Sequence, residues 1–79
     1  MYYVYIIKSI RFERYYIGCT CNILERLKFH NQGKTQSTKH YIPYKLVRVE
    51  NFKTRSLALK REKEIKRYKG GNAFKKLLQ

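Results

Sequence analysis

The stretch YYVYIIK at residues 2–8 decides the fold, because each of its first six residues is β-branched or aromatic. Such a run is typical of a strand that is buried on both faces and is therefore central in its sheet. Tyr3, Tyr5 and Ile7 share one face of this strand. The segment RYYIG at residues 14–18 follows a short polar stretch, which predicts a second strand, stopped at its glycine, in an antiparallel hairpin with the first.

Residues that begin and end helices mark two main helices and one short helix. Asn22 with Glu25 three positions later is a capping pair, and Gly33 supplies a left-handed stop. Two glycines at 70–71 end the second helix, and Asn72 caps the third. These signals predict helices over residues 22–32, from residues 54–56 to 69, and over residues 73–78.

The remaining segments complete one domain, which we expect to span residues 1–79. KLVRVENF at residues 45–52 alternates between two sets of side chains and predicts a third strand that is more edge-like than the first. Residues 34–44 are polar, contain the only proline and show no period, so they predict a loop that faces a substrate rather than the core.

Charge is the strongest signal in the composition. The 79 residues carry 19 Lys and Arg against 5 acidic residues, for a formal net charge of +14. A charge of this size attracts polyanions, so the natural partners are nucleic acid, an anionic membrane surface or an acidic protein. A chain this short leaves little room for a large substrate cavity. Small neutral substrates are therefore disfavoured.

The cysteines and the apolar segments indicate a cytoplasmic protein. No run approaches about 18 consecutive apolar residues, and the N-terminus lacks the features of a secretory signal. Cys19 and Cys21 are too close in sequence for an easy disulfide, so we expect reduced thiols. A zinc site built from these cysteines with His30 and His40 is conceivable, although the spacing matches no common ligand pattern.

The helical period of the first helix places basic side chains beside its apolar stripe. Ile23, Leu24 and Leu27 form the stripe, and Arg26 and His30 lie one turn apart along its rim. Either basic residue taken alone is more often a solvated or structural side chain than a functional one. Because they share this rim, Arg26 and His30 are both candidates for a functional site.

The second helix places a carboxylate on its inner stripe. Ala58 and Ile65 define this stripe, and Glu62 falls on it as the one inward acid, whereas Glu64 lies off it near Lys60. An inward carboxylate needs an Arg partner or a metal ion. With no Asp in the chain an all-protein metal cage is excluded, but one Glu with waters and a substrate phosphate is a common way to hold Mg²⁺.

Two tyrosines occupy positions where an ordinary core would use Phe or Val. Tyr5 lies in the middle of the first strand and Tyr16 lies beside Gly18. Buried phenols need hydrogen-bond partners. High β-propensity and ring stacking explain each tyrosine alone, but their combination with Arg26 and Glu62 favours a functional group.

The residues Tyr3-Val4-Tyr5, Tyr16-Ile17-Gly18, Arg26 and a Glu in the second helix together resemble the GIY-YIG nuclease family. The motifs TxNxxERLxxHN at 20–31 and ALKREKEIK at 58–66, with the closing KGGNAFKKLL, are similar to small stand-alone bacterial members that resemble the C subunit of the excision-repair nuclease. The resemblance implies an α+β fold, with a three-stranded antiparallel sheet flanked by two main helices and a short C-terminal helix. It also implies Mg²⁺- or Mn²⁺-dependent hydrolysis of a nucleic-acid phosphodiester.

The resemblance also implies roles for individual residues. Tyr5 and Tyr16 match the motif tyrosines that orient or deprotonate the attacking water. Arg26 matches the arginine that stabilises charge on the scissile phosphate, and Glu62 matches the metal-binding glutamate. His30 matches a helix histidine that is found in part of the family, which makes it a further catalytic candidate. Asn72 matches a downstream asparagine, and we expect it to contact substrate.

The leading hypothesis is therefore an endonuclease that is structure-dependent or weakly specific and acts in repair or recombination, with DNA favoured over RNA as its substrate. A protein partner could target it, and we expect no membrane contact. The alternative is a basic nucleic-acid-binding module of the same fold without useful cleavage. A third class, a protein-interaction or ribosome-associated basic protein, would explain the charge but not Glu62. The cations expected to contact substrate lie on the second helix and in the long loop, namely Lys60, Lys63, Lys66, Arg67 and Lys69 with Lys34 and Lys39.

Overall fold

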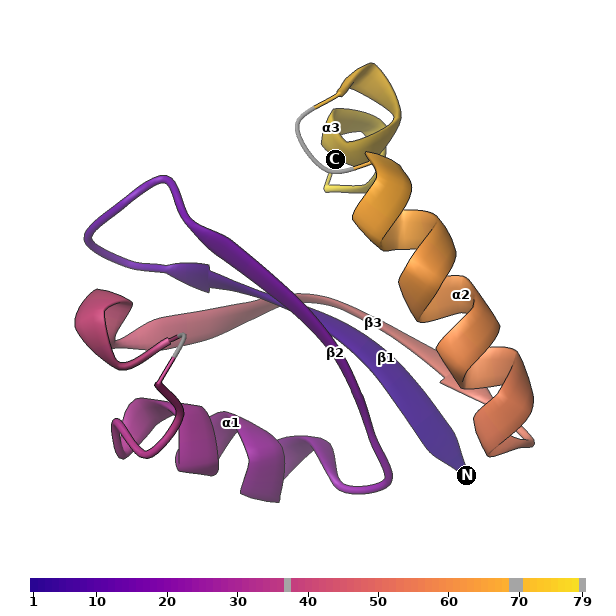
Figure 1. Cartoon of the computed structure of the whole chain (residues 1–79), viewed down its shortest axis with the longest axis horizontal. Coiled ribbons are helices and arrows are strands. Elements are labelled where there is room, and N and C mark those ends of the chain that lie inside the picture. The colour runs from indigo at the N-terminus through magenta and orange to yellow at the C-terminus, as the bar shows by residue number, and fades with distance from the viewer. Residues whose placement is uncertain (37, 69–70, 79) are drawn as a thin grey trace.

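The computed structural model describes residues 1–36, 38–68 and 71–78, and its centre is a three-stranded antiparallel sheet in the order β2-β1-β3 (Figure 1). The strands are β1 (Tyr2–Ser9), β2 (Tyr15–Thr20) and β3 (Tyr44–Phe52). The predicted central first strand, its hairpin with the second and the edge position of the third are confirmed. The predicted stop at Gly18 is wrong, because this glycine pairs with Tyr5 inside β2 and the strand continues beyond it.

Three α-helices flank the sheet, namely α1 (Ile23–Asn31), α2 (Arg55–Tyr68) and the short α3 (Asn72–Leu77). They confirm the predicted α+β fold. The segment predicted as a loop contains one turn of 3-10 helix, η1 (Lys39–Tyr41). Lys69 and Gly70, at the predicted end of the second helix, lie outside the described residues. No helix among the described residues is long and apolar enough to cross a membrane.

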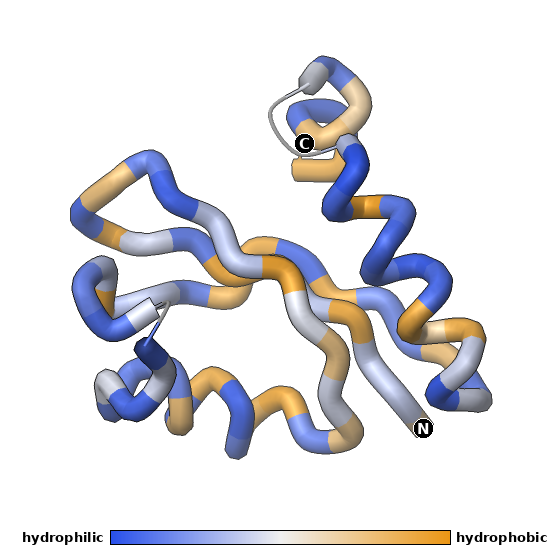
Figure 2. The backbone as a smooth tube through the Cα atoms, in the orientation of Figure 1, coloured by the Kyte–Doolittle hydropathy of each residue, from blue (hydrophilic) through white to orange (hydrophobic). Residues whose placement is uncertain are grey.

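The two faces of the sheet bury separate clusters, and apolar residues concentrate in the strands between them (Figure 2). On one face α2 and α3 cover a cluster of six buried residues, Val4, Ile6, Ile17, Ala58, Ile65 and Phe74. On the other face Tyr5, Ile7 and Tyr44 pack with Ile23 and Leu27 of α1. Because β1 alternates its side chains between these clusters, the phenol of Tyr5 lies on the α1 face.

The inward face of α1 differs from the predicted one. Leu24, predicted on the apolar stripe, is 80% exposed, and His30, predicted on the rim, is 1% exposed. Ile23, Leu27 and His30 share the inward face, because positions i, i+4 and i+7 lie on one side of a helix. Arg26 is exposed. The helix is therefore rotated so that an imidazole takes the place expected for a leucine.

The helix ends confirm the first predicted cap and correct the last. The Asn22 side chain accepts a hydrogen bond from the Glu25 backbone N–H at 3.1 Å, and Gly33 has a φ of 73° that suits glycine. Asn72, predicted to cap the third helix, is instead its first residue, and the extended Gly71 precedes it as a cap without a side-chain hydrogen bond. Asn72 is exposed there.

Candidate active site

The centre of the site is a buried chain of three polar side chains. The Tyr5 hydroxyl lies 3.0 Å from Nε2 of His30, and Nδ1 of His30 lies 3.2 Å from the Thr38 hydroxyl. Tyr5 is 3% exposed, and His30 and Thr38 are buried as well. Burial and the nearby Arg26 charge lower the pKa of His30, so its imidazole is neutral near pH 7. A neutral imidazole accepts at one nitrogen only, so one of its two partners donates to it.

Burial, reinforced by the proximity of Tyr16, raises the pKa of Tyr5 well above its usual value. The Tyr5 side chain is therefore a neutral phenol that can donate to His30 Nε2, with the Nδ1–H of His30 donated to Thr38. The same pKa is lowered by Arg26 and raised by Glu62. Charges on both α1 and α2 therefore act on this phenol.

Gly18 makes room for Tyr5. The two residues are paired across β1 and β2, and a Cβ atom added to Gly18 would clash with the Tyr5 hydroxyl oxygen. Any larger side chain would displace the phenol, because no real Cβ approaches an oxygen so closely. The requirement at this position is space, since its backbone is that of an ordinary strand.

Tyr16 completes the aromatic part of the site. Its ring centre lies 4.7 Å from that of His30 and 6.3 Å from that of Tyr5. Unlike Tyr5, it is only partly buried. The predicted pair of tyrosines thus converges on one histidine, with Tyr16 nearer to solvent.

Arg26 and Glu62 approach the site from different helices. The Arg26 guanidinium carbon lies 5.8 Å from the centre of the Phe29 ring, beside a small hollow of about 290 Å³. The Glu62 side chain is 16% exposed and forms an ion pair with Lys66 at 2.7 Å. Burial raises the pKa of the Cys19 thiol; Glu62 also raises it, whereas Arg55 and Arg26 lower it. Cys19 therefore lies where the charges of α1 and α2 meet.

Glu62 is not the one inward acid that the sequence suggested. Glu50 of β3 has a side chain only 18% exposed, and its carboxylate accepts hydrogen bonds from Arg61 and Arg48, each at 2.8 Å. These arginines hold its pKa below the usual range, with Arg61 the main cause. Glu64 pairs with Arg61 rather than with Lys60 as expected. Glu50 is thus fully paired by arginine, whereas Glu62 is paired by a single exposed lysine.

The donor set at Glu62 fits a metal ion that is held mainly by water and substrate. Among the described residues, no three side chains of the His, Cys, Asp and Glu types gather to hold an ion. Mg²⁺ often binds proteins through one or two carboxylates and keeps several waters, and Mn²⁺ shares its preference for oxygen ligands. Glu62 could hold such an ion on exchanging its lysine partner. In the alternative zinc site of Cys19, Cys21, His30 and His40, His30 is not free to bind the metal, because both of its ring nitrogens are in hydrogen bonds.

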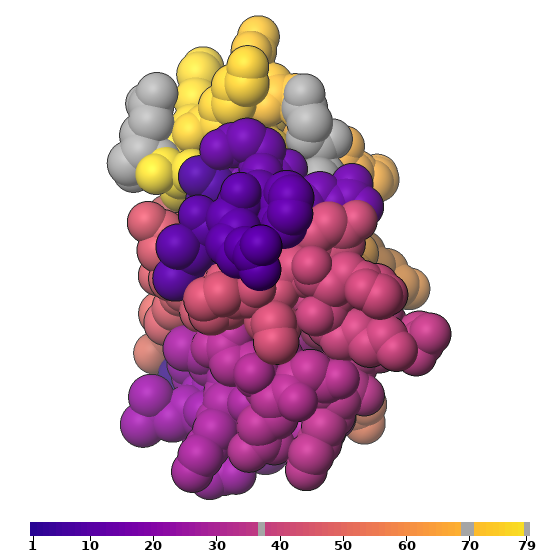
Figure 3. Space-filling model, turned by 90° about the vertical axis from the view of Figure 1, so that its left-hand side faces the viewer, coloured from indigo at the N-terminus to yellow at the C-terminus, as the bar shows by residue number. Residues whose placement is uncertain are grey.

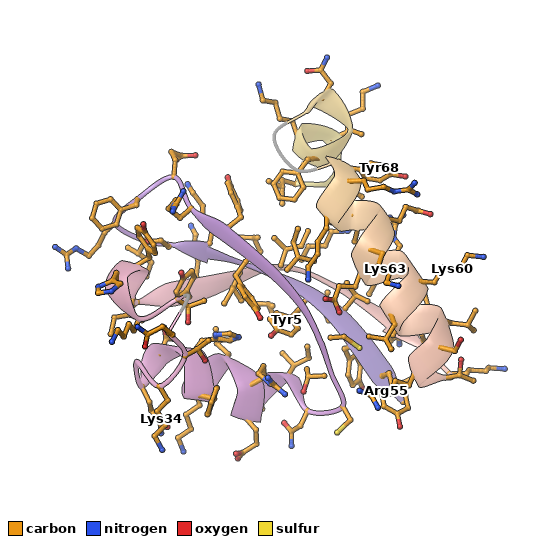
Figure 4. All side chains as sticks on the ribbon, in the orientation of Figure 1. Tyr5, Lys34, Arg55, Lys60, Lys63 and Tyr68 are labelled. Atoms are coloured by element: carbon orange, nitrogen blue, oxygen red, sulfur yellow. The ribbon has the colours of Figure 1, made fainter. Side chains whose placement is uncertain are left out.

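The predicted substrate-binding cations form two separate groups. Lys60, Lys63 and Arg67 line a shallow hollow of about 520 Å³ on α2, together with Lys66 and Glu64. Lys34 projects from the far end of the molecule, beyond α1 (Figure 4), and Lys39 lies in η1. Lys69 lies outside the described residues. The cations on α2 could contact one stretch of backbone, whereas Lys34 would contact a different part of the substrate.

Two functional features were missed by sequence reasoning. Thr38 lies in a segment without a period, so no pattern indicated that its hydroxyl reaches His30. Asn31 holds the start of β3 through two hydrogen bonds to the Tyr44 backbone, at 2.7 and 3.1 Å. The signals for Asn31 were its position directly after His30 at the end of a predicted helix and its place as the last residue of the motif at 20–31.

Comparisons with known proteins agree with this geometry. The model of the GIY-YIG catalytic domain matches residues 1–75. A UPF0213 protein of Haloquadratum walsbyi is 43% identical over 68 residues, covering 85% of this chain and 75% of that protein. A UPF0213 protein of Staphylococcus haemolyticus is 41% identical over 68 residues, covering 85% and 82%. The solution NMR structure of a UPF0213 protein from Bacillus halodurans matches with a TM-score of 0.50 and 30% identity, covering 85% of this chain and 72% of that chain.

This small α+β domain, with two tyrosines converging on a buried histidine and with an arginine and a glutamate on flanking helices, is matched over most of its length by the model of a nuclease family's catalytic domain. The chain belongs to the GIY-YIG family, and its relatives are small UPF0213 proteins.

Proposed function

We propose that this protein is a divalent-metal-dependent endonuclease that hydrolyses phosphodiester bonds, with DNA favoured over RNA. The observation that carries the proposal is the Tyr5–His30 hydrogen bond of 3.0 Å beside Tyr16, because pure phosphate binding needs no buried phenol–imidazole pair. The formal charge of +14 supports a nucleic-acid substrate. Structure-dependent cleavage in repair or recombination is the role that we infer for it.

Each side chain of the site has a separate role in hydrolysis. Tyr16, the more exposed phenol, orients the attacking water. A proton from that water passes to the Tyr5 hydroxyl as the original Tyr5 proton moves to Nε2 of His30, which becomes an imidazolium. The water oxygen bonds to phosphorus, the P–O bond to the leaving sugar oxygen breaks, and that oxygen takes a proton from solvent while the imidazolium returns its own proton to solvent. Arg26 stabilises the negative charge that develops on the phosphate. A Mg²⁺ or Mn²⁺ ion held by Glu62 would supply Lewis-acid stabilisation of the same charge.

The experiment that tests the proposal compares two glutamates on one helix. Wild type, Glu62→Ala and Glu64→Ala are incubated with labelled duplex, flap, branched and single-stranded substrates, with Mg²⁺, with Mn²⁺ and with chelator. We expect Glu62→Ala to abolish cleavage and to bind as well as wild type or slightly more tightly, because one negative charge near the phosphate is removed. Glu64→Ala should change cleavage little, since Glu64 forms an ion pair only with Arg61 among the described residues, and Arg61 keeps its hydrogen bond to Glu50.

Loss of cleavage in Glu64→Ala with retention in Glu62→Ala would contradict the assignment of the metal ligand. The alternative function is a basic module of the same fold that binds nucleic acid without useful cleavage. It predicts salt-sensitive binding with no product from any substrate in either metal.

A further inference from the structure

A groove of about 500 Å³ lies at the open edge of β2. Since β2 pairs only with β1, its other edge has no partner strand among the described residues. Tyr15 and Tyr16 both line the groove although neighbouring side chains of a strand point to opposite faces, so the groove wraps around the edge. Figure 3 shows the β1–β2 turn between α3 and the segment that contains η1.

Aromatic side chains line this groove on both sides of the β2 edge. On one side the Tyr15 and Phe74 rings meet edge to face with centres 5.2 Å apart. On the other side lie Tyr16, Tyr41 and Tyr44. Phe74 and Tyr44 are themselves buried, so the half-buried rings of Tyr15, Tyr16 and Tyr41 are the ones that a ligand can touch. A site for phosphate alone would need cations and backbone N–H groups, whereas flat rings suit a flat ligand.

Cations stand beside the aromatic walls. The Arg14 guanidinium lies over the Tyr41 ring, 4.6 Å from its centre, and donates a hydrogen bond to the Tyr41 hydroxyl at 2.9 Å. Lys75 of α3 lines the opposite wall. Glu13 also lines the groove, but Lys8 pairs with it at 3.0 Å. The ligand therefore combines an aromatic face with negative charge.

The groove is continuous with the candidate active site. Tyr16 lines the groove and packs against His30, and Thr38 lines the groove and hydrogen-bonds to His30. A strand of nucleic acid with its phosphate at the site would place a neighbouring nucleotide at the groove.

We propose that this groove binds an unpaired nucleobase next to the phosphate that is cleaved, and this inference rests on the proposed function. A base inside a duplex has both faces covered by its neighbours, so only a base from a single strand, a flap or a branch point can stack on these rings. Stacking on aromatic side chains accepts any base, because every base has a π-face. The groove therefore selects for substrate structure and not for sequence.

Abasic substitution tests the groove without requiring cleavage. Binding of short fluorescent single strands is measured by anisotropy in chelator, with one nucleotide at a time replaced by an abasic one. We expect wild type to lose about tenfold or more in affinity at one position, as for the loss of one stacked base, and little at the others. In Tyr41→Ala the difference in affinity between the abasic and the intact strand should become smaller, because one of the rings on which the base stacks has been removed.

A matched pair on α3 tests the charge. Lys75 lines the groove and Lys76 does not, while both are exposed and belong to one helix. Lys75→Ala should reduce the salt dependence of single-strand binding, and Lys76→Ala should leave it unchanged. An equal loss at every abasic position, or a position-dependent loss of the same size in Tyr41→Ala as in wild type, would overturn the proposal. Because these measurements exclude metal, a protein that cleaves nothing can still show the abasic effect, so the two proposals fail separately.

Discussion

Burying an imidazole requires partners for both ring nitrogens, and His30 finds them in Tyr5 and Thr38. Thr38 belongs to a different segment from the helix that carries His30. Its hydroxyl can accept from the Nδ1–H and thereby leaves Nε2 free to accept from Tyr5. Thr38 thus sets the direction of the Tyr5 hydrogen bond through His30, without a hydrogen bond of its own to Tyr5 or Tyr16.

Thr38→Val should remove this acceptor at nearly constant side-chain volume. The unpaired Nδ1–H would then lower the free energy of unfolding by about 1–3 kcal/mol, measured by urea denaturation. We also expect a mixture of His30 tautomers in the nitrogen NMR spectrum. Thr38→Ser is the control, since it keeps the hydroxyl and should restore one tautomer. A single unchanged tautomer in Thr38→Val would contradict the proposed direction of the hydrogen bonds.

The residues with motif signals were found from sequence, whereas their partners were not. Tyr5 and Glu62 stood out because a phenol in mid-strand and a carboxylate on an apolar stripe break local patterns. Thr38 breaks no pattern, because polar residues are ordinary in a loop. The reason for Gly18 also needed the structure, since only the strand register shows that Tyr5 lies opposite it.

At the level of elements, half-buried charged side chains join the sheet to its helices. Glu50 of β3 binds Arg61 of α2, while Arg48 donates both to Glu50 and to the Leu77 backbone carbonyl of α3, the latter at 3.1 Å. One strand face thereby fixes both helices on its side of the sheet. Strand and helix types followed from sequence periodicity, but the rotation of α1 did not, because a buried histidine carries no hydrophobic signal.

Glu50 should make stability depend on pH in the acidic range. Its pKa is lowered from 4.5 in the folded state by Arg61 and Arg48, so the unfolded state binds more protons as pH falls below that value. The stabilisation is complete above the unfolded pKa and is lost as pH falls through the folded pKa. We expect Glu50→Gln to be less stable than wild type at pH 7 and to show a smaller fall in stability between about pH 5 and pH 3.

Thermal unfolding across this pH range measures the effect, with Glu13→Gln as the control because that glutamate is exposed. His30 makes stability depend on pH in a higher range, since its lowered pKa in the folded state means that protonation below about pH 6.5 favours the unfolded state. Equal pH dependence in wild type and Glu50→Gln would mean that Glu50 is not held by the arginines in solution.

At the scale of the whole molecule, the cations are distributed unevenly, and α2 carries a group on its outer side (Figure 4). A face kept only for solubility usually mixes both signs, whereas this hollow contains four cations and one acid that is already paired. If the α2 group contacts phosphates of duplex DNA, each contact should add about −0.9 to the slope of log affinity against log salt concentration.

The double variant Lys63→Ala, Arg67→Ala should therefore make that slope shallower by about 1.8 for two lost contacts. The double variant Lys45→Ala, Lys53→Ala is the matched control, because it removes the same charge from exposed positions outside the α2 group. Its slope should stay near that of wild type. Titrations at several salt concentrations in chelator distinguish direct phosphate contact from a general effect of net charge, since net charge alone would change the slope equally in both double variants. Equal slopes in all three proteins would mean that this face of α2 does not meet the substrate.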